Sequence, residues 1–189
     1  MHGRERVWAS LTLCLCWIAI AADRVMAGRP GELLWTCYVA VAMMALSALA
    51  GRSRPLAAGL LFHAAVGAPA YGLQVLVTGQ ATPAAVLAHV LPVAVGARII
   101  RSAGYPKHTL PGALALHAAC WSAAWLWTDP RFNVNLAHKL WPPLLPQFED
   151  AVLARGGAVL AVCLLLWAGD WLVRRLLHPR AGLASPADL

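Results

Sequence analysis

The chain has 189 residues, of which 60% are hydrophobic and only 12% are charged. A soluble domain carries about a quarter charged residues, so this composition excludes water as the main solvent of the surface. The net charge of +7 does not indicate a nucleic-acid partner, because the basic residues stand in short groups between apolar runs and not on one face or arm. We therefore expect a single integral membrane domain over residues 1–189, in contact with membrane lipids and without nucleic acid.

Six apolar runs have, or nearly have, the length that a helix needs to cross a bilayer, about 20 residues with a range of about 17–25. The runs are Val7 to Ala22, Leu33 to Ala50, Leu56 to Thr78, Pro83 to Ile100, Thr109 to Trp127 and Ala151 to Val173. They predict an all-α fold, a polytopic transmembrane helical bundle of about six spans. The first run is the shortest, and Val25–Met26–Ala27 after it offers a cleavage site, so a cleaved signal peptide stays open as an alternative.

The basic residues also predict an orientation, because cytoplasmic loops carry an excess of Lys and Arg. With the N-terminus inside, ten basic residues fall on the inner side and five on the outer side. The inner ten are Arg4, Arg6, Arg52, Arg54, Arg98, Arg101, Lys107, Arg174, Arg175 and Arg180, and the outer five are Arg24, Arg29, Arg131, Lys139 and Arg155. We expect a bacterial cytoplasmic (inner) membrane with both termini in the cytoplasm.

Some residues inside the runs carry structural expectations. Pro69 is expected to kink the third span, and Asp170 and Arg174 are spaced for an ion pair on one helix face. The five cysteines all lie in apolar runs without a CxxC pair, so we expect neither a disulfide framework nor a metal site. They are Cys14, Cys16, Cys37, Cys120 and Cys163.

Ionisable residues within a span are costly and are functional candidates by default. Counting about 1.5 Å per residue, Thr36 and Cys37 lie roughly 5 Å below the outer surface and His89 lies roughly 9 Å below it. A nucleophile and a base thus share a depth on different helices, which is typical of a Cys–His or Thr–His catalytic pair. The alternative is that these side chains only form hydrogen bonds and close packing between helices.

The connection from Thr128 to Asp150 lies above this pair in the predicted topology and is rich in polar residues. Its candidate substrate-binding residues are Asp129, Asn133, Asn135 and His138. The apolar residues of the connection predict that it packs onto the bundle.

His63 and His117 form a second candidate pair, roughly 10 and 12 Å from the inner surface on different spans. Two histidines at one depth suit a haem iron, although the sequence has no CxxCH attachment motif. Hydrogen bonding between helices is the preferred interpretation, so no cofactor is expected.

Four short segments occur in a particular order along the chain. They are Leu33-Leu34-Trp35-Thr36-Cys37 before a basic turn at Arg52, His89-Val90-Leu91-Pro92, Gly104-Tyr105-Pro106, and Asn133-Val134-Asn135-Leu136 followed by Lys139 and Pro142. This order resembles the bacterial YwaF-type integral membrane family and its eukaryotic relatives that act as phospholipid acyltransferases. It is also similar to the androgen-induced membrane hydrolases, which cleave fatty acid esters of hydroxy fatty acids. The resemblance implies that His89 works with Cys37 on the acyltransferase pattern, or with Thr36 on the hydrolase pattern.

The leading hypothesis is a small membrane enzyme that hydrolyses or transfers lipid acyl groups near the outer leaflet. Cys37 would attack the ester carbonyl, His89 would move the proton, and Asn133 or Asn135 would donate hydrogen bonds to the oxyanion. A non-catalytic membrane partner, a small transporter and a haem-binding protein stay open as alternatives, as does a homo- or hetero-oligomer.

Overall fold

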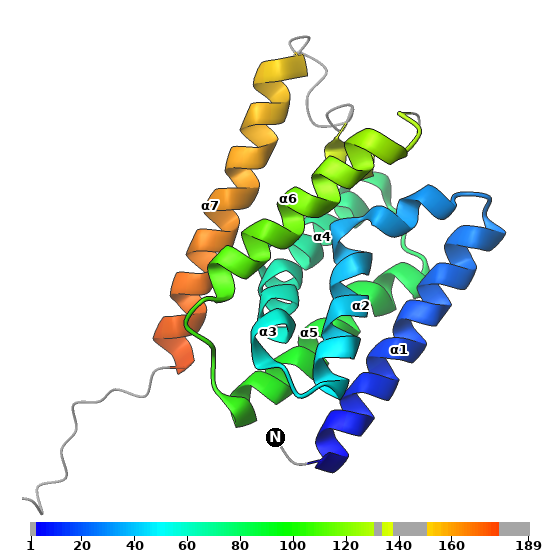
Figure 1. The fold of residues 1–189 in the computed structure, drawn as a ribbon. Coiled ribbons are helices and arrows are strands. Elements are labelled where there is room, and N and C mark those ends of the chain that lie inside the picture. The colour runs from blue at the N-terminus through cyan, green and yellow to red at the C-terminus, as the bar shows by residue number, and fades with distance from the viewer. Residues whose placement is uncertain (1–2, 131–133, 138–150, 178–189) are drawn as a thin grey trace, which may run out of the picture.

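The computed structural model describes residues 3–130, 134–137 and 151–177, and the regular elements in these residues are helical. The α-helices in chain order are α1 (Gly3–Met26), α2 (Thr36–Leu49), α3 (Ser53–Phe62), α4 (Ala68–Thr78), α5 (Pro83–Ala103), α6 (Thr109–Trp127) and α7 (Ala151–Leu177) (Figure 1). Three short elements accompany them: the 3-10 helices η1 (Pro30–Leu34) and η3 (Val134–Leu136) and the π-helix η2 (His63–Gly67).

The predicted all-α helical bundle is confirmed, and each of the six apolar runs contains a helix. Four of the described helices are long and apolar enough to cross a membrane, namely Gly3–Met26, Ser53–Thr78, Pro83–Ala103 and Arg155–Leu176. The remaining two runs hold α2, an apolar helix of 14 residues, and α6, with 19 residues. The chain therefore has the architecture of an integral membrane protein.

Two boundaries differ from the prediction. Helix α1 continues through Arg24 to Met26, because Arg24 pairs with Asp23 and donates to the buried Glu32 at 2.7 Å. The second run is not one helix, because η1 ends at an extended Trp35 (ψ 129°) and α2 begins only at Thr36. Helix α2 is therefore about 21 Å long, shorter than a hydrocarbon core of about 30 Å.

Helix α3 lies at the centre of the bundle. Its residues from Leu56 to Phe62 are all buried, and it packs against α2, α5 and α6. Helix α1 packs against α2 and α5, while α7 lies at the edge against α6 and η2 (Figure 1). Apolar side chains on the outer faces of α1 and α7 are exposed, as expected for surfaces that face lipid.

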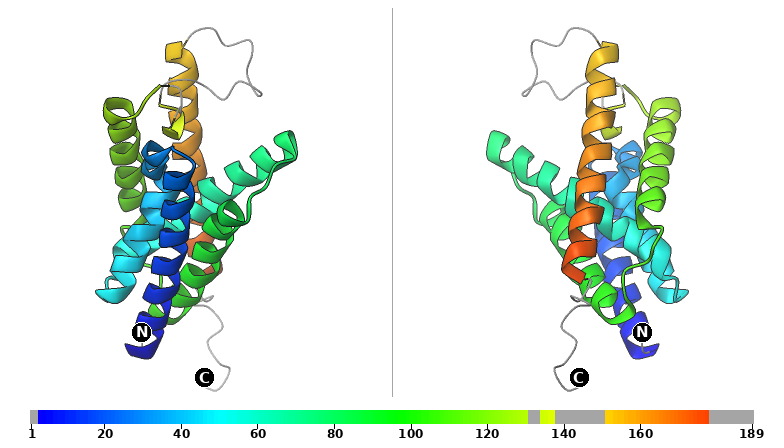
Figure 2. Two further views of the ribbon diagram at one scale, coloured as in Figure 1. Left: turned by 90° about the vertical axis from the view of Figure 1, so that its right-hand side faces the viewer. Right: turned by 90° about the vertical axis from the view of Figure 1, so that its left-hand side faces the viewer.

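The first residues of α1 and the last residues of α7 lie at the same end of the bundle, together with the α2–α3 connection (Figure 2). We call this end the basic end. The described segments there carry Arg4, Arg6, Arg52, Arg54, Arg98, Arg101, Lys107, Arg174 and Arg175. These are nine of the ten basic residues that the sequence predicts to share one side.

A polar network fastens α7 at the basic end. Arg174 donates to Asp170 at 2.7 Å, which confirms the predicted ion pair, and also to the carbonyl of Lys107 at 2.7 Å. The hydroxyl of Tyr105 donates to Asp170 at 2.8 Å. Burial and this bond to the carboxylate raise the pKa of Tyr105, so the phenol keeps its proton and remains a donor.

Small residues let the helices approach closely. This is common in membrane proteins, because the hydrophobic effect does not drive helices together in lipid and close packing replaces it. A Cβ atom placed on Gly96 of α5 would lie 2.8 Å from Met44 of α2. One placed on Gly169 of α7 would lie 2.7 Å from the Cβ atom of Ala65 in η2. The second contact leaves less room for a larger residue, because the Cβ atom of Ala65 can move only if its backbone moves, whereas the end of the Met44 side chain is flexible.

The third span is interrupted by η2 and then leaves the bundle. Pro69 has no N–H, and its ring would clash with the carbonyl four residues earlier in a regular α-helix. The chain accommodates the proline with a π-helical turn, in which the N–H of Ala68 donates to the carbonyl of His63. Beyond it, α4 has no buried residue and projects away from the other helices (Figure 2). The expected kink at Pro69 thus takes the form of a π-helix.

We predict that Gly169→Ala destabilises the protein by about 1–3 kcal/mol, because the new methyl group overpacks the contact with Ala65. Gly157→Ala is the matched control, since it lies on the same helix and a Cβ atom there meets nothing within 4 Å. Thermal unfolding in detergent measures both. Equal melting temperatures for the two variants would contradict the close contact between α7 and η2.

Candidate functional site

The side chain of Asn135 caps the start of α2. The first N–H groups of a helix have no partner within it, and the side chain of Trp35 at the N-cap position makes no capping hydrogen bond. Asn135 Oδ1 instead accepts from the N–H of Thr36 at 2.7 Å. Asn135 Nδ2 donates to the carbonyls of Leu34 at 2.8 Å and Cys120 at 3.1 Å. One buried amide therefore joins η3, η1, α2 and α6.

This arrangement leaves Asn135 no free donor. Both hydrogens of its amide are directed at backbone carbonyls, so in this conformation neither is available to an oxyanion. Its backbone has φ 55°, a left-handed conformation that Asn tolerates better than most residues. The structure gives Asn135 a capping role, and its contact with a substrate stays a prediction.

Thr36 meets His117 and not His89. Its Oγ1 lies 3.0 Å from Asn135 Oδ1, and an amide oxygen only accepts, so the hydroxyl donates its one proton there. His117 Nδ1, 3.3 Å from the same hydroxyl, then acts as a donor to it. The Thr36 proton thus points at an amide and not at a base, unlike the proton of an activated nucleophile.

Cys37 follows Thr36 by about 100° around the helix and faces a different set of side chains. These side chains meet around Gly67 in η2. A Cβ atom placed on Gly67 would lie 3.6 Å from Cys37 Cβ, 3.7 Å from His89 Cδ2 and 3.9 Å from His63 Cδ2. Cys37 from α2, His89 from α5 and His63 therefore each lie against Gly67.

The two imidazoles at this point lie against backbone carbonyls. His89 Nδ1 lies 2.7 Å from the carbonyl of Ala85, and His63 Nδ1 lies 3.2 Å from the carbonyl of Gly59. A carbonyl accepts, so the neutral ring of His89 carries its proton on Nδ1 and a lone pair on Nε2. The lone pair of His89 Nε2 is what a general base needs.

Two buried polar atoms near His89 have no partner among the described residues. They are Nε2 of His63 and the hydroxyl oxygen of Tyr71. The Tyr71 ring stacks on His89 with centroids 4.5 Å apart and planes 4° apart, and the ring of His63 lies 6.2 Å from His89. Buried polar atoms normally have a partner, so each of these two atoms is a candidate contact for a polar group of a ligand.

The remaining predicted residues are less informative. Asp129 is half-buried just after α6, while Asn133, His138 and the connection from 138 to 150 lie outside the described residues. His63 and His117 have different neighbours, because His63 is tilted against His89 whereas His117 stacks on Phe62 at 5.5 Å. These ring contacts do not favour a shared haem.

Tyr71 and the pairing of Thr36 with His117 are absent from the predicted site. Tyr71 stacks on His89 because η2 changes the helical register between His63 and α4. Thr36 reaches His117 because α2 begins at this buried residue inside the bundle. Neither feature has a local sequence signal apart from Pro69.

Comparison of the chain with protein-family models, curated proteins and solved structures finds no match.

We predict that Asn135→Ala lowers the free energy of unfolding by about 2–3 kcal/mol, because it leaves the Thr36 N–H and two carbonyls without their partner. Asn135→Gly removes the same side chain without backbone strain, since Gly accepts φ 55° at no steric cost. Comparison of the two variants therefore distinguishes loss of the capping side chain from strain in the backbone. Chemical unfolding in mixed micelles measures both. If both variants unfold at the same denaturant concentration as the wild-type protein, Asn135 does not cap α2.

Proposed function

We propose that this chain is a small membrane enzyme acting on lipid acyl esters, with Cys37 as the nucleophile and His89 as the base. The observation that carries the proposal is the approach of Cys37, His89 and His63 to Gly67, next to two unpartnered polar atoms. Histidine and cysteine from different helices, meeting in an apolar bundle, match the residue types that a thiol-dependent acyl transfer requires. The resemblance to the YwaF-type family and its acyltransferase relatives supports the same pair, whereas the pattern of the androgen-induced hydrolases pairs His89 with Thr36.

The chemistry follows from the proton positions. His89 Nε2 would take the thiol proton as Cys37 Sγ attacks the ester carbonyl carbon, giving a tetrahedral oxyanion. Collapse of this intermediate would break the bond to the alcohol, which leaves with the proton from His89. The acyl group is then a thioester on Cys37. Water, or a second alcohol, would attack the thioester while His89 again accepts the proton, and the thiolate that leaves would recover this proton from His89 as the acid or a new ester is released.

The two unpartnered atoms have complementary roles in this scheme. Tyr71 is a hydroxyl donor beside His89 and would stabilise the oxyanion. His63 Nε2 would form a hydrogen bond with the attacking water or alcohol and orient it. Asn135 has no part in this step, because its amide is engaged by the start of α2.

The surroundings of the site suit a lipid substrate. Tyr71 stands on α4, whose apolar side chains Leu73 and Leu76 are exposed, and the nearby part of α5 exposes Leu87 and Val90. In a bilayer these faces meet acyl chains, so a lipid would reach the site sideways, without passing through water. We place the site in the outer half of a bacterial inner membrane, with the basic end and both termini in the cytoplasm, on the count of basic residues.

We predict that His89→Gln lowers hydrolysis of a medium-chain p-nitrophenyl ester by detergent-solubilised protein about 10²–10⁴-fold, as expected for loss of a general base. Cys37→Ala should abolish turnover and also remove labelling by a long-chain iodoacetamide. Cys163→Ala and His108→Gln are matched controls, because Cys163 is half-buried in α7 and His108 is exposed before α6. Both should keep wild-type turnover, and the melting temperature verifies that each variant is folded.

If the Cys37→Ala and His89→Gln proteins are folded and retain wild-type ester turnover, the pair takes no part in the reaction and the proposal is contradicted. Absence of turnover in the wild-type protein, with no preference of the electrophile for Cys37 over Cys163, would favour the non-catalytic membrane partner. Thr36→Val adds a further discrimination, since loss of turnover in it alone would transfer the nucleophile role to Thr36.

A further inference from the structure

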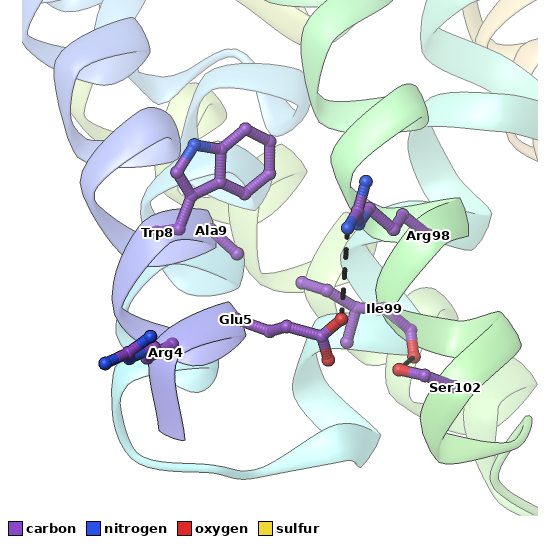
Figure 3. Close-up of a pocket in the computed structure, with 7 residues that line it drawn as sticks. All are labelled: Arg4, Glu5, Trp8, Ala9, Arg98, Ile99 and Ser102. Carbon is purple, nitrogen blue, oxygen red and sulfur yellow. Dashed lines mark hydrogen bonds and ion pairs between the residues drawn. The ribbon is translucent and has the colours of Figure 1, made fainter. Parts of the chain in front are cut away.

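A pocket of about 380 Å³ lies between α1 and α5 at the basic end, and neither the residues around Gly67 nor Gly67 itself lines it. Its inner wall is apolar and consists of Ala9 and Ile99, both buried, with the indole of Trp8 at the side (Figure 3). Its rim is polar and contains Arg4 and Glu5 from α1 and Arg98 and Ser102 from α5. The pocket thus combines an apolar interior with a rim in which two positive charges outnumber one negative charge.

The guanidinium of Arg98 is available to a ligand. Its side chain is 71% exposed, and its contact with Glu5 is 3.9 Å long (Figure 3). Such an exposed pair contributes little energy and leaves the other guanidinium N–H groups free to donate to a phosphate in the paired geometry that Arg favours. The same guanidinium lies 5.9 Å from the centre of the Trp8 ring, which holds it over the pocket.

Exposed apolar stripes continue from the rim toward the middle of the bundle. On α1, Leu11 and Leu15 follow Trp8 at spacings of three and four and are 60% and 67% exposed. On α5, Leu87 stands eleven residues, about three turns, before Arg98 and is 50% exposed. Residues at these spacings lie on one face of a helix, so each stripe begins at the charged rim and runs into the depth of the hydrocarbon.

We propose that this pocket binds an anionic phospholipid, with its phosphate at Arg98, the charge of Arg4 adding to the positive rim, and its acyl chains along Leu11, Leu15 and Leu87. The charge of the rim complements a phosphodiester, and the apolar wall complements glycerol and the first acyl carbons. Trp8 stands near the charged end of α1, the position that indole prefers beside headgroups. A zwitterionic lipid offers the same phosphate but adds a cation that the two arginines disfavour. This inference is independent of the proposed enzymatic function.

The test uses the full chain purified in detergent, with lipid binding followed by native mass spectrometry. Phosphatidylglycerol should be retained in preference to phosphatidylcholine of the same acyl chains. Arg98→Gln should reduce phosphatidylglycerol binding about tenfold, as expected for loss of a charge-assisted bond, and Arg4→Gln should weaken it further in combination. Arg54→Gln is the matched control, since Arg54 is exposed at the basic end and does not line the pocket.

Equal retention of the two lipids, or Arg98→Gln binding like the wild type, would overturn the proposal. An equal loss in Arg54→Gln would also overturn it, because it would reveal only general attraction to the basic end. Quenching of tryptophan fluorescence by brominated phosphatidylglycerol gives a second readout, which should fall in Trp8→Phe and persist in Trp171→Phe.

Discussion

The geometry around the candidate site depends on the amide of Asn135. Hydrocarbon offers no water to satisfy backbone groups, yet α2 begins inside the bundle, where Thr36 contacts His117. Asn135 resolves this conflict by accepting the first N–H of α2 while it donates to the carbonyls of Leu34 and Cys120. Once Thr36 is held on that side, the helix turns Cys37 toward η2. Asn135 therefore orients the proposed nucleophile without contacting it.

The π-helix supplies the other half of the arrangement. It places Gly67, which has no side chain, where Cys37, His63 and His89 each approach it, and it sends α4 outward so that Tyr71 stacks on His89. Single π-helical turns within α-helices are frequent at functional sites. Among the described residues, polar atoms of His63 and Tyr71 have no partner beside this turn, a cost that a substrate with an ester group would offset.

The sequence predicts those features that are local. The six helical runs follow from length and hydropathy, and the ion pair of Asp170 with Arg174 follows from a spacing of four. The partner of Thr36 is not predictable in this way, because a depth counted from Leu33 assumes one continuous helix, whereas α2 starts three residues later inside the bundle. The place of Tyr71 depends on the register change in η2, which only Pro69 signals. Long-range pairing of this kind is a property of packing, and no local pattern encodes it.

The proposed chemistry requires that Cys37 lies against Gly67 with His89 beside it. The most direct measurement is disulfide formation in the Gly67→Cys variant, because the new Cβ atom would stand 3.6 Å from Cys37 Cβ, within the range of about 3.5–4.5 Å that a disulfide requires. Mild oxidation in membranes followed by peptide mass mapping should show the introduced thiol at position 67 joined to Cys37, and the joined protein should resist the long-chain iodoacetamide. If both thiols remain free after oxidation, this placement of Cys37 is contradicted. Alkylation of each thiol by a small reagent after unfolding verifies that both were present in reduced form.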